Sequence, residues 1–258
     1  AQVEVRTTDT IPQILLENSD YQRAAVVESI LPNEATSTAY EALVNIFCEH
    51  KRGNVSQFTT GTGFFIDTDG IILTNAHVAH FLLMDGLIGE TTCVVRTGNP
   101  AAMKYTADLL YISPAWVREN AAIFTEKIPE GTGERDYALL YVTGATDGQA
   151  LPQQFPALPF ETALMRTGDV GNTVYAAGYP ANALIESLGE VGLTPRLATS
   201  TIAELMTFGS NYADVFTIRG TEVGERGVSG GPIITTAGQT IGLISTRGDD
   251  EEFGDGSL

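Results

Sequence analysis

Short apolar runs, bounded by turn-forming residues, recur along most of the chain. Between residues 44 and 97 they read VNIFCE, TGFFID, IILTN and TTCVVRT, and turn signals such as Gly-Asn and Thr-Asp-Gly lie between them. Runs of this length, rich in β-branched and aromatic residues, are typical of β-strands. We therefore expect an antiparallel meander that begins at Val44.

A second series of strand-like runs occupies the C-terminal half. It reads NTVYAAGYP, PRLATSTIAEL, DVFTIRG, GPIITT and QTIGLIST. Between the two series, residues 149–159 carry three prolines, which disfavour both helix and the interior of a sheet. The pattern predicts two β units, at residues 44–148 and 160–258, with residues 149–159 as a linker.

Helical patterning is confined to a few segments. Residues 113–126 begin with a serine at the N-cap and a proline at the first helical position, and apolar residues follow at helical spacing. This pattern predicts a helical insert. Residues 21–32 and 35–44 are each expected to form a short helix or irregular cover, so residues 1–43 are interpreted as an N-terminal extension outside the core.

Composition and charge narrow the range of functions. Of the 258 residues, 43% are hydrophobic and 18% charged, with 27 glycines and 11 prolines, which is typical of a turn-rich, strand-rich globular protein. The formal net charge of -18 repels phosphate backbones, so nucleic acid is not an expected partner. The apolar runs are far shorter than the roughly 18 residues of a membrane span, so no span is expected.

The two cysteines leave alternatives open. Cys48 and Cys93 either form one disulfide or are two small buried residues. The sequence has neither a CxxC pair nor a zincin motif, so no metal site is predicted. His50 and His80 are interpreted as polar residues that lie at the surface or are partly buried.

A histidine, an aspartate and a serine stand in settings suited to nucleophilic catalysis. His77 follows the apolar run IILTN, a rigid place for a general base. Asp136 directly precedes the apolar run YALLYV, where its carboxylate can be drawn under a histidine ring. Ser229 lies in GERGVSGGPI, whose glycines let backbone amides point inward. We expect these three to act as base, orienting acid and nucleophile, with the amides of Gly227 and Ser229 as an oxyanion hole.

Together these motifs resemble a known family. GTGFFI, ILTNAHV, DYALL and GVSGGPI, in the order His, Asp, Ser, resemble the trypsin and chymotrypsin clan, most closely the HtrA-like bacterial proteases. The resemblance spans about residues 44–247. It implies an all-β fold of two six-stranded antiparallel β-barrels, and a serine endopeptidase that acts on a polypeptide without a cofactor. By analogy with the family, an extracytoplasmic location, periplasmic or secreted, is expected.

The resemblance also assigns substrate-binding residues. Those on the strand that pairs with the substrate backbone are Ser245, Thr246 and Arg247. Ser245 is expected close to Asp136. Val223 falls where trypsin-like enzymes carry the acid that selects Arg or Lys, so tryptic specificity is not expected. Ile244 falls where glutamyl endopeptidases carry a histidine, so only Arg247 supports an acidic P1 residue. A small or medium apolar P1 residue is predicted.

Several features depart from the family. Val228 precedes the serine, where trypsin-like enzymes have an aspartate that pairs with a freed N-terminus and HtrA-like enzymes an asparagine, so activation by N-terminal insertion is not expected. The insert at residues 113–126 either shapes the rim of the site, binds a partner or is inert. Only residues 248–258 follow Arg247, where the family adds a strand that walls the S1 pocket, and no PDZ domain is expected.

Two alternatives stand beside an active protease. One is a latent protease whose oxyanion loop stays collapsed until a ligand, an oligomer partner or a further segment reorders it. The other is a catalytically silent module that keeps the fold and holds a protein partner. In an active form we expect the Gly227 amide to point into the cleft, and in a latent form away from it.

Overall fold

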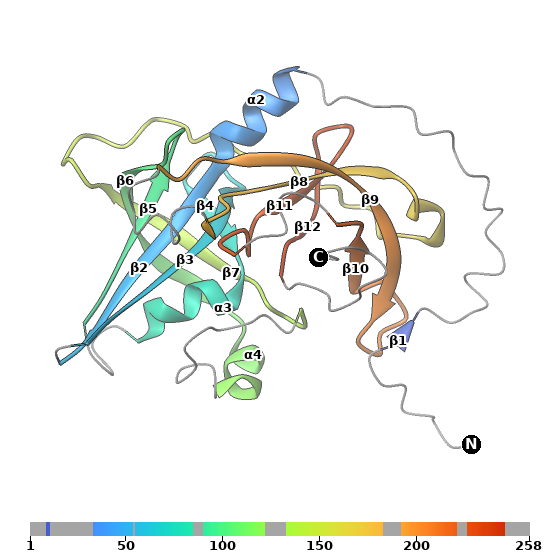
Figure 1. Ribbon diagram of the computed structural model, residues 1–258, viewed down its shortest axis with the longest axis horizontal. Helices are drawn as coiled ribbons and strands as arrows, with labels where there is room; N and C mark the ends of the chain where they lie inside the picture. Colours follow the sequence, from blue (N-terminus) through green and yellow to red (C-terminus); the bar gives the residue numbers. More distant parts are fainter. Residues whose placement is uncertain are drawn as a thin grey trace.

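The computed structural model of the 258-residue chain describes residues 9–10, 33–53, 55–84, 90–121, 133–182, 192–220 and 226–245. Its strands form two units side by side, a closed barrel and a curled open sheet (Figure 1). The helix predicted at residues 21–32 lies outside the described residues. Within the described part of the chain, no helix is long and apolar enough to cross a bilayer.

The closed barrel consists of antiparallel strands in the order β2-β3-β4-β7-β6-β5. They are β2 (Leu43–Arg52), β3 (Val55–Phe65), β4 (Ile71–Thr74), β5 (Glu90–Thr97), β6 (Ala102–Ile112) and β7 (Ala138–Ala145). Side chains alternate between core and solvent along β7, where Ala138, Leu140 and Val142 point inward. Because the barrel closes, its strands leave no unpaired edge. Strand β6 was not predicted from the sequence.

The second unit is an open six-stranded sheet in the order β1-β9-β8-β11-β12, with β10 paired to β9. Its strands are β1 (Asp9–Thr10), β8 (Thr173–Gly178), β9 (Arg196–Thr207), β10 (Val215–Ile218), β11 (Pro232–Thr235) and β12 (Thr240–Leu243). The predicted all-β, chymotrypsin-like fold is confirmed. The second unit is a curled half-barrel rather than a closed barrel, because among the described residues β12 pairs with a single strand, β11, and its Thr240 otherwise bonds to Pro159 and Glu161 at the end of the linker.

Short helices connect and cover the two units. They are α2 (Asn33–Ala42), α3 (Ala76–Ala79), η1 (His80–Leu83), α4 (Pro114–Glu119) and η3 (Thr167–Asp169). Helix α2 packs Ala39 and Ala42 into an apolar cluster that contains Phe64 of the barrel and Tyr179 of the open sheet. This cluster joins the units. The helix predicted at residues 35–44 therefore ends at Ala42, where β2 takes over.

Of the predicted helical insert, the described residues form the α-helix α4 over Pro114–Glu119. Helix α4 ends at Glu119, because the backbone of Asn120 leaves the helical region (φ -113°, ψ 29°) and its side-chain amide donates to the carbonyl of Trp116 at 2.9 Å. The N-cap is the predicted serine, Ser113, whose hydroxyl accepts from the Trp116 amide. Residues 122–126 of the predicted helix lie outside the described residues.

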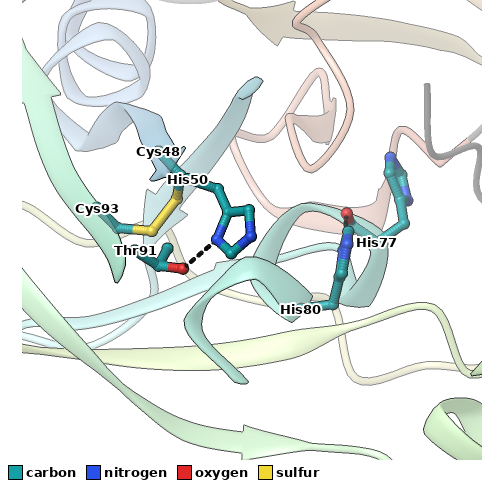
Figure 2. The surroundings of a disulfide bond; sticks show 6 residues. All are labelled: Cys48, His50, His77, His80, Thr91 and Cys93. Carbon is teal, nitrogen blue, oxygen red and sulfur yellow. Dashed lines mark hydrogen bonds between the residues drawn. A yellow bond between two sulfur atoms is a disulfide. The ribbon is translucent and has the colours of Figure 1, made fainter. Parts of the chain in front are cut away.

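The cysteines form a disulfide, which decides between the two alternatives. Cys48 on β2 and Cys93 on β5 are cross-strand partners with Cα atoms 4.1 Å apart (Figure 2). The interpretation of His50 and His80 as surface or partly buried residues is wrong, because they are only 5% and 1% exposed. Each is accommodated by a hydrogen bond, which offsets the burial of a polar ring. For His50 this bond joins Nδ1 to the hydroxyl of Thr91 at 2.8 Å.

Candidate active site

His77 lies in α3, the short helix that follows β4. Strand β4 ends at Thr74, and Asn75 turns the chain into the helix. The side-chain amide of Asn75 donates to the carbonyl of Asp136 at 2.8 Å, which ties the start of α3 to the segment before β7. His77 is 4% exposed, and its backbone amide donates to Asp136 Oδ1 at 2.9 Å. Barrel contacts therefore fix the backbone that carries the imidazole.

Asp136 accepts hydrogen bonds from both units. Nδ1 of His77 lies 2.8 Å from Oδ2, and the hydroxyl of Ser245, just after β12, donates to the same oxygen at 2.7 Å. Ser245 thus lies beside Asp136, where the resemblance places it. An ionised carboxylate only accepts, so Nδ1 carries the proton and Nε2 is the ring's acceptor. This tautomer leaves Nε2 able to take a proton from a hydroxyl group.

The environment keeps Asp136 ionised although it is buried. Desolvation alone would raise its pKa, but the hydrogen bonds from His77 and Ser245 and the charge interaction with His77 outweigh burial and lower the pKa from its ordinary value. A carboxylate that stays ionised next to the ring stabilises positive charge on that ring. The pair therefore has the electrostatics that a general base needs.

Ser229 lies in the turn before β11, and this turn packs against the barrel. The carbonyl of Ser229 accepts from the amide of Thr62 on β3 at 2.8 Å. Gly230 has a φ of +86°, and a Cβ there would meet the Thr62 carbonyl and come within 3.1 Å of the Asn75 amide nitrogen. Ser229 is thus next to the segment that leads into His77. Among the described residues no hydrogen bond joins its hydroxyl to His77, a contact that often tightens only when substrate binds.

The backbone carbonyls from Arg226 to Ser229 all accept hydrogen bonds. Their donors, in chain order, are Ala181 N (2.7 Å), Thr62 Oγ1 (2.7 Å), Gly231 N (2.8 Å) and Thr62 N (2.8 Å). In a trans peptide the N–H points away from the preceding carbonyl, so the bonds at the Arg226 and Val228 carbonyls also set the direction of the Gly227 and Ser229 amides. Within the described part of the chain, neither amide donates to a protein acceptor.

Val228 anchors this turn by burial. Its side chain is 2% exposed and packs with Val174, Ile233 and Ile244 in the core of the open sheet. Burying a valine side chain stabilises a fold by about 1.5–3 kcal/mol. The residue that departs from the family's aspartate or asparagine therefore fixes the turn through apolar contacts rather than through an ion pair or an amide.

The helical insert contacts the residues that precede the base and the acid. Trp116 of α4 is fully buried and shares an apolar cluster with Ala76, the residue before His77. Arg135, the residue before the acid, has a φ of 54°, and its guanidinium binds both carboxylate oxygens of Glu119 at 3.1 Å. The described part of the insert thus packs beside the base and bonds to the residue before the acid, a role not among the three considered from the sequence.

His80, which is buried in the barrel, contacts the backbone of His77. Its Nδ1 donates to the carbonyl of His77 at 2.6 Å, and Figure 2 shows the two rings projecting from one short helical segment. Burial is the main cause that lowers the pKa of His80 to about 4, against the hydrogen bond to His77, which raises it. At neutral pH His80 is therefore uncharged and places no second positive charge beside His77.

The other predicted residues fall into two groups. Val223, Thr246 and Arg247 lie outside the described residues. Ile244 is 2% exposed and packs in the core of the open sheet. In the described part of the chain, no three His, Cys, Asp or Glu side chains gather where they could hold a metal ion.

A closed antiparallel barrel beside a curled half-barrel, with a histidine–aspartate pair where they meet, is the architecture of chymotrypsin-like double-barrel proteins. The family model for the trypsin-like peptidase domain matches residues 61–243, which is more than half of the chain. The chain therefore belongs to the family of trypsin-like peptidase domains. A search of curated proteins finds no match.

Proposed function

We propose that the protein is a serine endopeptidase in which Ser229 is the nucleophile, His77 the general base and Asp136 the orienting acid. The observation that carries the proposal is the buried hydrogen bond from His77 Nδ1 to Asp136 Oδ2, because it fixes the tautomer that leaves Nε2 free to accept a proton. Family membership supports a polypeptide as substrate.

The reaction follows from these positions. Ser229 Oγ attacks the carbonyl carbon of the scissile peptide bond while Nε2 of His77 takes the hydroxyl proton. The tetrahedral intermediate collapses, the C–N bond breaks, and His77 returns the proton to the leaving amine. Water then attacks the acyl-enzyme with His77 again as base, which releases the acid product and restores the serine. Asp136 stays ionised throughout and stabilises the imidazolium.

The amides of Gly227 and Ser229 are the proposed oxyanion hole. Support comes from the turn itself, whose carbonyls are all bonded to donors and whose Gly227 and Ser229 amides have no protein acceptor among the described residues. A collapsed loop would instead satisfy such amides internally. These contacts favour the active form over the latent one, and donors held in advance of the reaction are the most effective kind.

Specificity and location are part of the proposal. We propose a small or medium apolar P1 residue, since the sequence places Val223 where tryptic enzymes carry an acid and Ile244 where glutamyl endopeptidases carry a histidine. The motifs quoted above favour the HtrA-like branch of the family. The Cys48–Cys93 disulfide supports an extracytoplasmic location, because disulfides persist in oxidising compartments.

Digestion of an unfolded protein substrate tests the activity. Reduced and alkylated casein is incubated with the protein and with Ser229→Ala, and the peptides are sequenced by mass spectrometry. We expect cleavage products only with the unmutated protein, and small or medium apolar residues enriched on the N-terminal side of each cut.

Equal digestion by both proteins would assign the cleavage to a contaminant and contradict the proposal. No digestion by either protein would leave the catalytically silent binding module as the better account. Cuts after Arg or Lys would contradict the specificity and leave the activity standing.

A further inference from the structure

The side chain of Thr62 joins the barrel to the turn that carries Ser229. Its hydroxyl donates to the carbonyl of Gly227 at 2.7 Å and accepts from the amide of Tyr179 at 2.9 Å. The residue is fully buried, so water does not compete for these bonds. A hydroxyl has a single proton to donate, and here the proton goes to Gly227. Thr62 touches none of the reacting groups.

Gly227 is the residue whose peptide groups decide where the first proposed oxyanion donor points. Its φ is +93°, and a Cβ there would lie 2.8 Å from both the Tyr179 carbonyl oxygen and the Ala181 side chain. On its N-terminal side the carbonyl of Arg226 is held by the Ala181 amide at 2.7 Å. On its C-terminal side the holding group is the Thr62 hydroxyl. The bond from Ala181 holds the peptide group that carries the Gly227 amide, and the Thr62 hydroxyl holds the next peptide group, so Gly227 is fixed on both sides and cannot take up a flip of its amide by turning its carbonyl.

We propose that Thr62 is a positioning residue that presets the oxyanion loop, acting through Gly227. The inference rests on the proposed serine endopeptidase function and adds the group that fixes the Gly227–Val228 peptide, which lies between the two proposed donors. It also explains how the loop is held where Val228 makes neither the ion pair nor the amide contact of related enzymes. The buried valine fixes the position of the loop, and the threonine hydroxyl fixes the direction of its peptide groups.

The surroundings of Thr62 make it a firm support. Its backbone pairs with Asn45 of β2, its amide holds the Ser229 carbonyl, and its own carbonyl accepts from the hydroxyl of Thr74 at 2.7 Å. Strand β3 is part of the closed barrel, so displacement of Thr62 would disturb several paired strands at once. Through its hydroxyl, the barrel therefore restrains the turn that carries Ser229.

Substitutions that keep or remove the hydroxyl test the inference. Thr62→Val keeps the shape and loses the hydrogen bonds, whereas Thr62→Ser keeps the hydroxyl. The matched control is Ser200→Ala, which removes a buried hydroxyl that donates to the Arg219 carbonyl at 2.7 Å in β9. The measurements are the rate of labelling by a fluorophosphonate, read by intact mass, and the melting temperature of each protein.

We expect Thr62→Val to label about ten- to a hundredfold more slowly than the unmutated protein, since one oriented oxyanion donor contributes on that scale or above it. Thr62→Ser should restore labelling to within about threefold, and Ser200→Ala should lower the melting temperature without slowing labelling. If Thr62→Val does not fold, Thr62→Cys replaces it, because a thiol fills the same site and is only a weak donor.

Two results overturn the inference. One is labelling of Thr62→Val at the unmutated rate, and the other is an equal loss in Thr62→Ser, which would make the methyl group and not the hydroxyl the important part. Failure of the unmutated protein to label is a different outcome, because it removes the proposed function together with the inference.

Discussion

The closed barrel and the open sheet hold their parts of the site in different ways. The barrel carries His77 and Asp136, which are tied to each other by two hydrogen bonds and to the start of α3 by a third. The open sheet carries the Ser229 turn, and two of the four carbonyls of that turn are bonded to Thr62, a barrel residue. Hydrogen bonds from the closed barrel therefore help to fix the Ser229 turn of the open sheet.

This difference suggests why the site lies where the units meet. A closed barrel offers a fixed frame for a base and its acid, because every strand is paired on both sides. A turn at the end of a curled sheet has fewer neighbours of its own, and it gains order by docking on that frame. Changes in the barrel should accordingly affect the nucleophile as well as the base.

The largest expected effect comes from breaking the base–acid pair. Asp136→Asn keeps the shape of the side chain but holds the His77 ring in the wrong tautomer, so kcat should fall about ten-thousandfold. The control is Asp108→Asn, which removes the same charge from an exposed position on β6. Substrate turnover and the melting temperature are measured for both. A loss of less than about tenfold in Asp136→Asn would show that Asp136 does not orient the base.

The next effect is on stability and comes from the disulfide in the barrel. Removing the disulfide with Cys48→Ala and Cys93→Ala frees a 45-residue loop in the unfolded chain, which should lower the free energy of unfolding by about 4 kcal/mol. Urea unfolding with and without a reducing agent measures it, and the reductant should affect only the unmutated protein. If the reductant destabilises the double variant to the same extent, the effect does not come from this disulfide.

A smaller effect concerns His80 and pH. In the unfolded chain His80 gains a proton near pH 6.5, but in the folded protein its pKa is about 4, so the stability it contributes is full above pH 6.5 and is lost as the pH falls towards 4. The expected loss over this window is about 3 kcal/mol. Urea unfolding at several pH values should give a flatter profile for His80→Phe. Identical slopes for both proteins would contradict the assignment.

The smallest effect concerns the hydrogen bond from Ser245 to Asp136, which joins the two units at the site. Ser245→Ala removes a hydrogen bond that lowers the pKa of Asp136, so that pKa should rise and fluorophosphonate labelling should slow by about tenfold. Labelling rates across pH for this variant and for Ser200→Ala measure it. A loss as large as that of Asp136→Asn would give Ser245 a greater role than the geometry does.

Among the described strands, the sequence predicted all but the two-residue β1 and the longer β6. The runs that became β2 to β5 and β8 to β12 are apolar enough to stand out. Strand β6 presents Lys104, Thr106 and Asp108 to solvent, and its two register shifts interrupt the alternation. The pairing partners on both sides, rather than the sequence of β6, make it a strand.

The candidate site likewise contains residues that the sequence predicts and contacts that it does not predict. His77, Asp136 and Ser229 are visible in the sequence because each sits in a short motif. The supporting contacts are not visible, since Thr62 meets Gly227 across 165 residues of sequence and Tyr179 across 117. Burial of His80 likewise follows from the place of η1 in the barrel. Such features arise from tertiary structure and have no local signal.

Everything proposed for this protein depends on Ser229 being an activated nucleophile. The most direct test is incubation with a fluorophosphonate probe followed by intact mass measurement of the unmutated protein and of Ser229→Ala. We expect one adduct on the unmutated protein, located at Ser229 by peptide mapping, and none on the variant. An unlabelled wild-type chain, or equal labelling of both proteins, would contradict it.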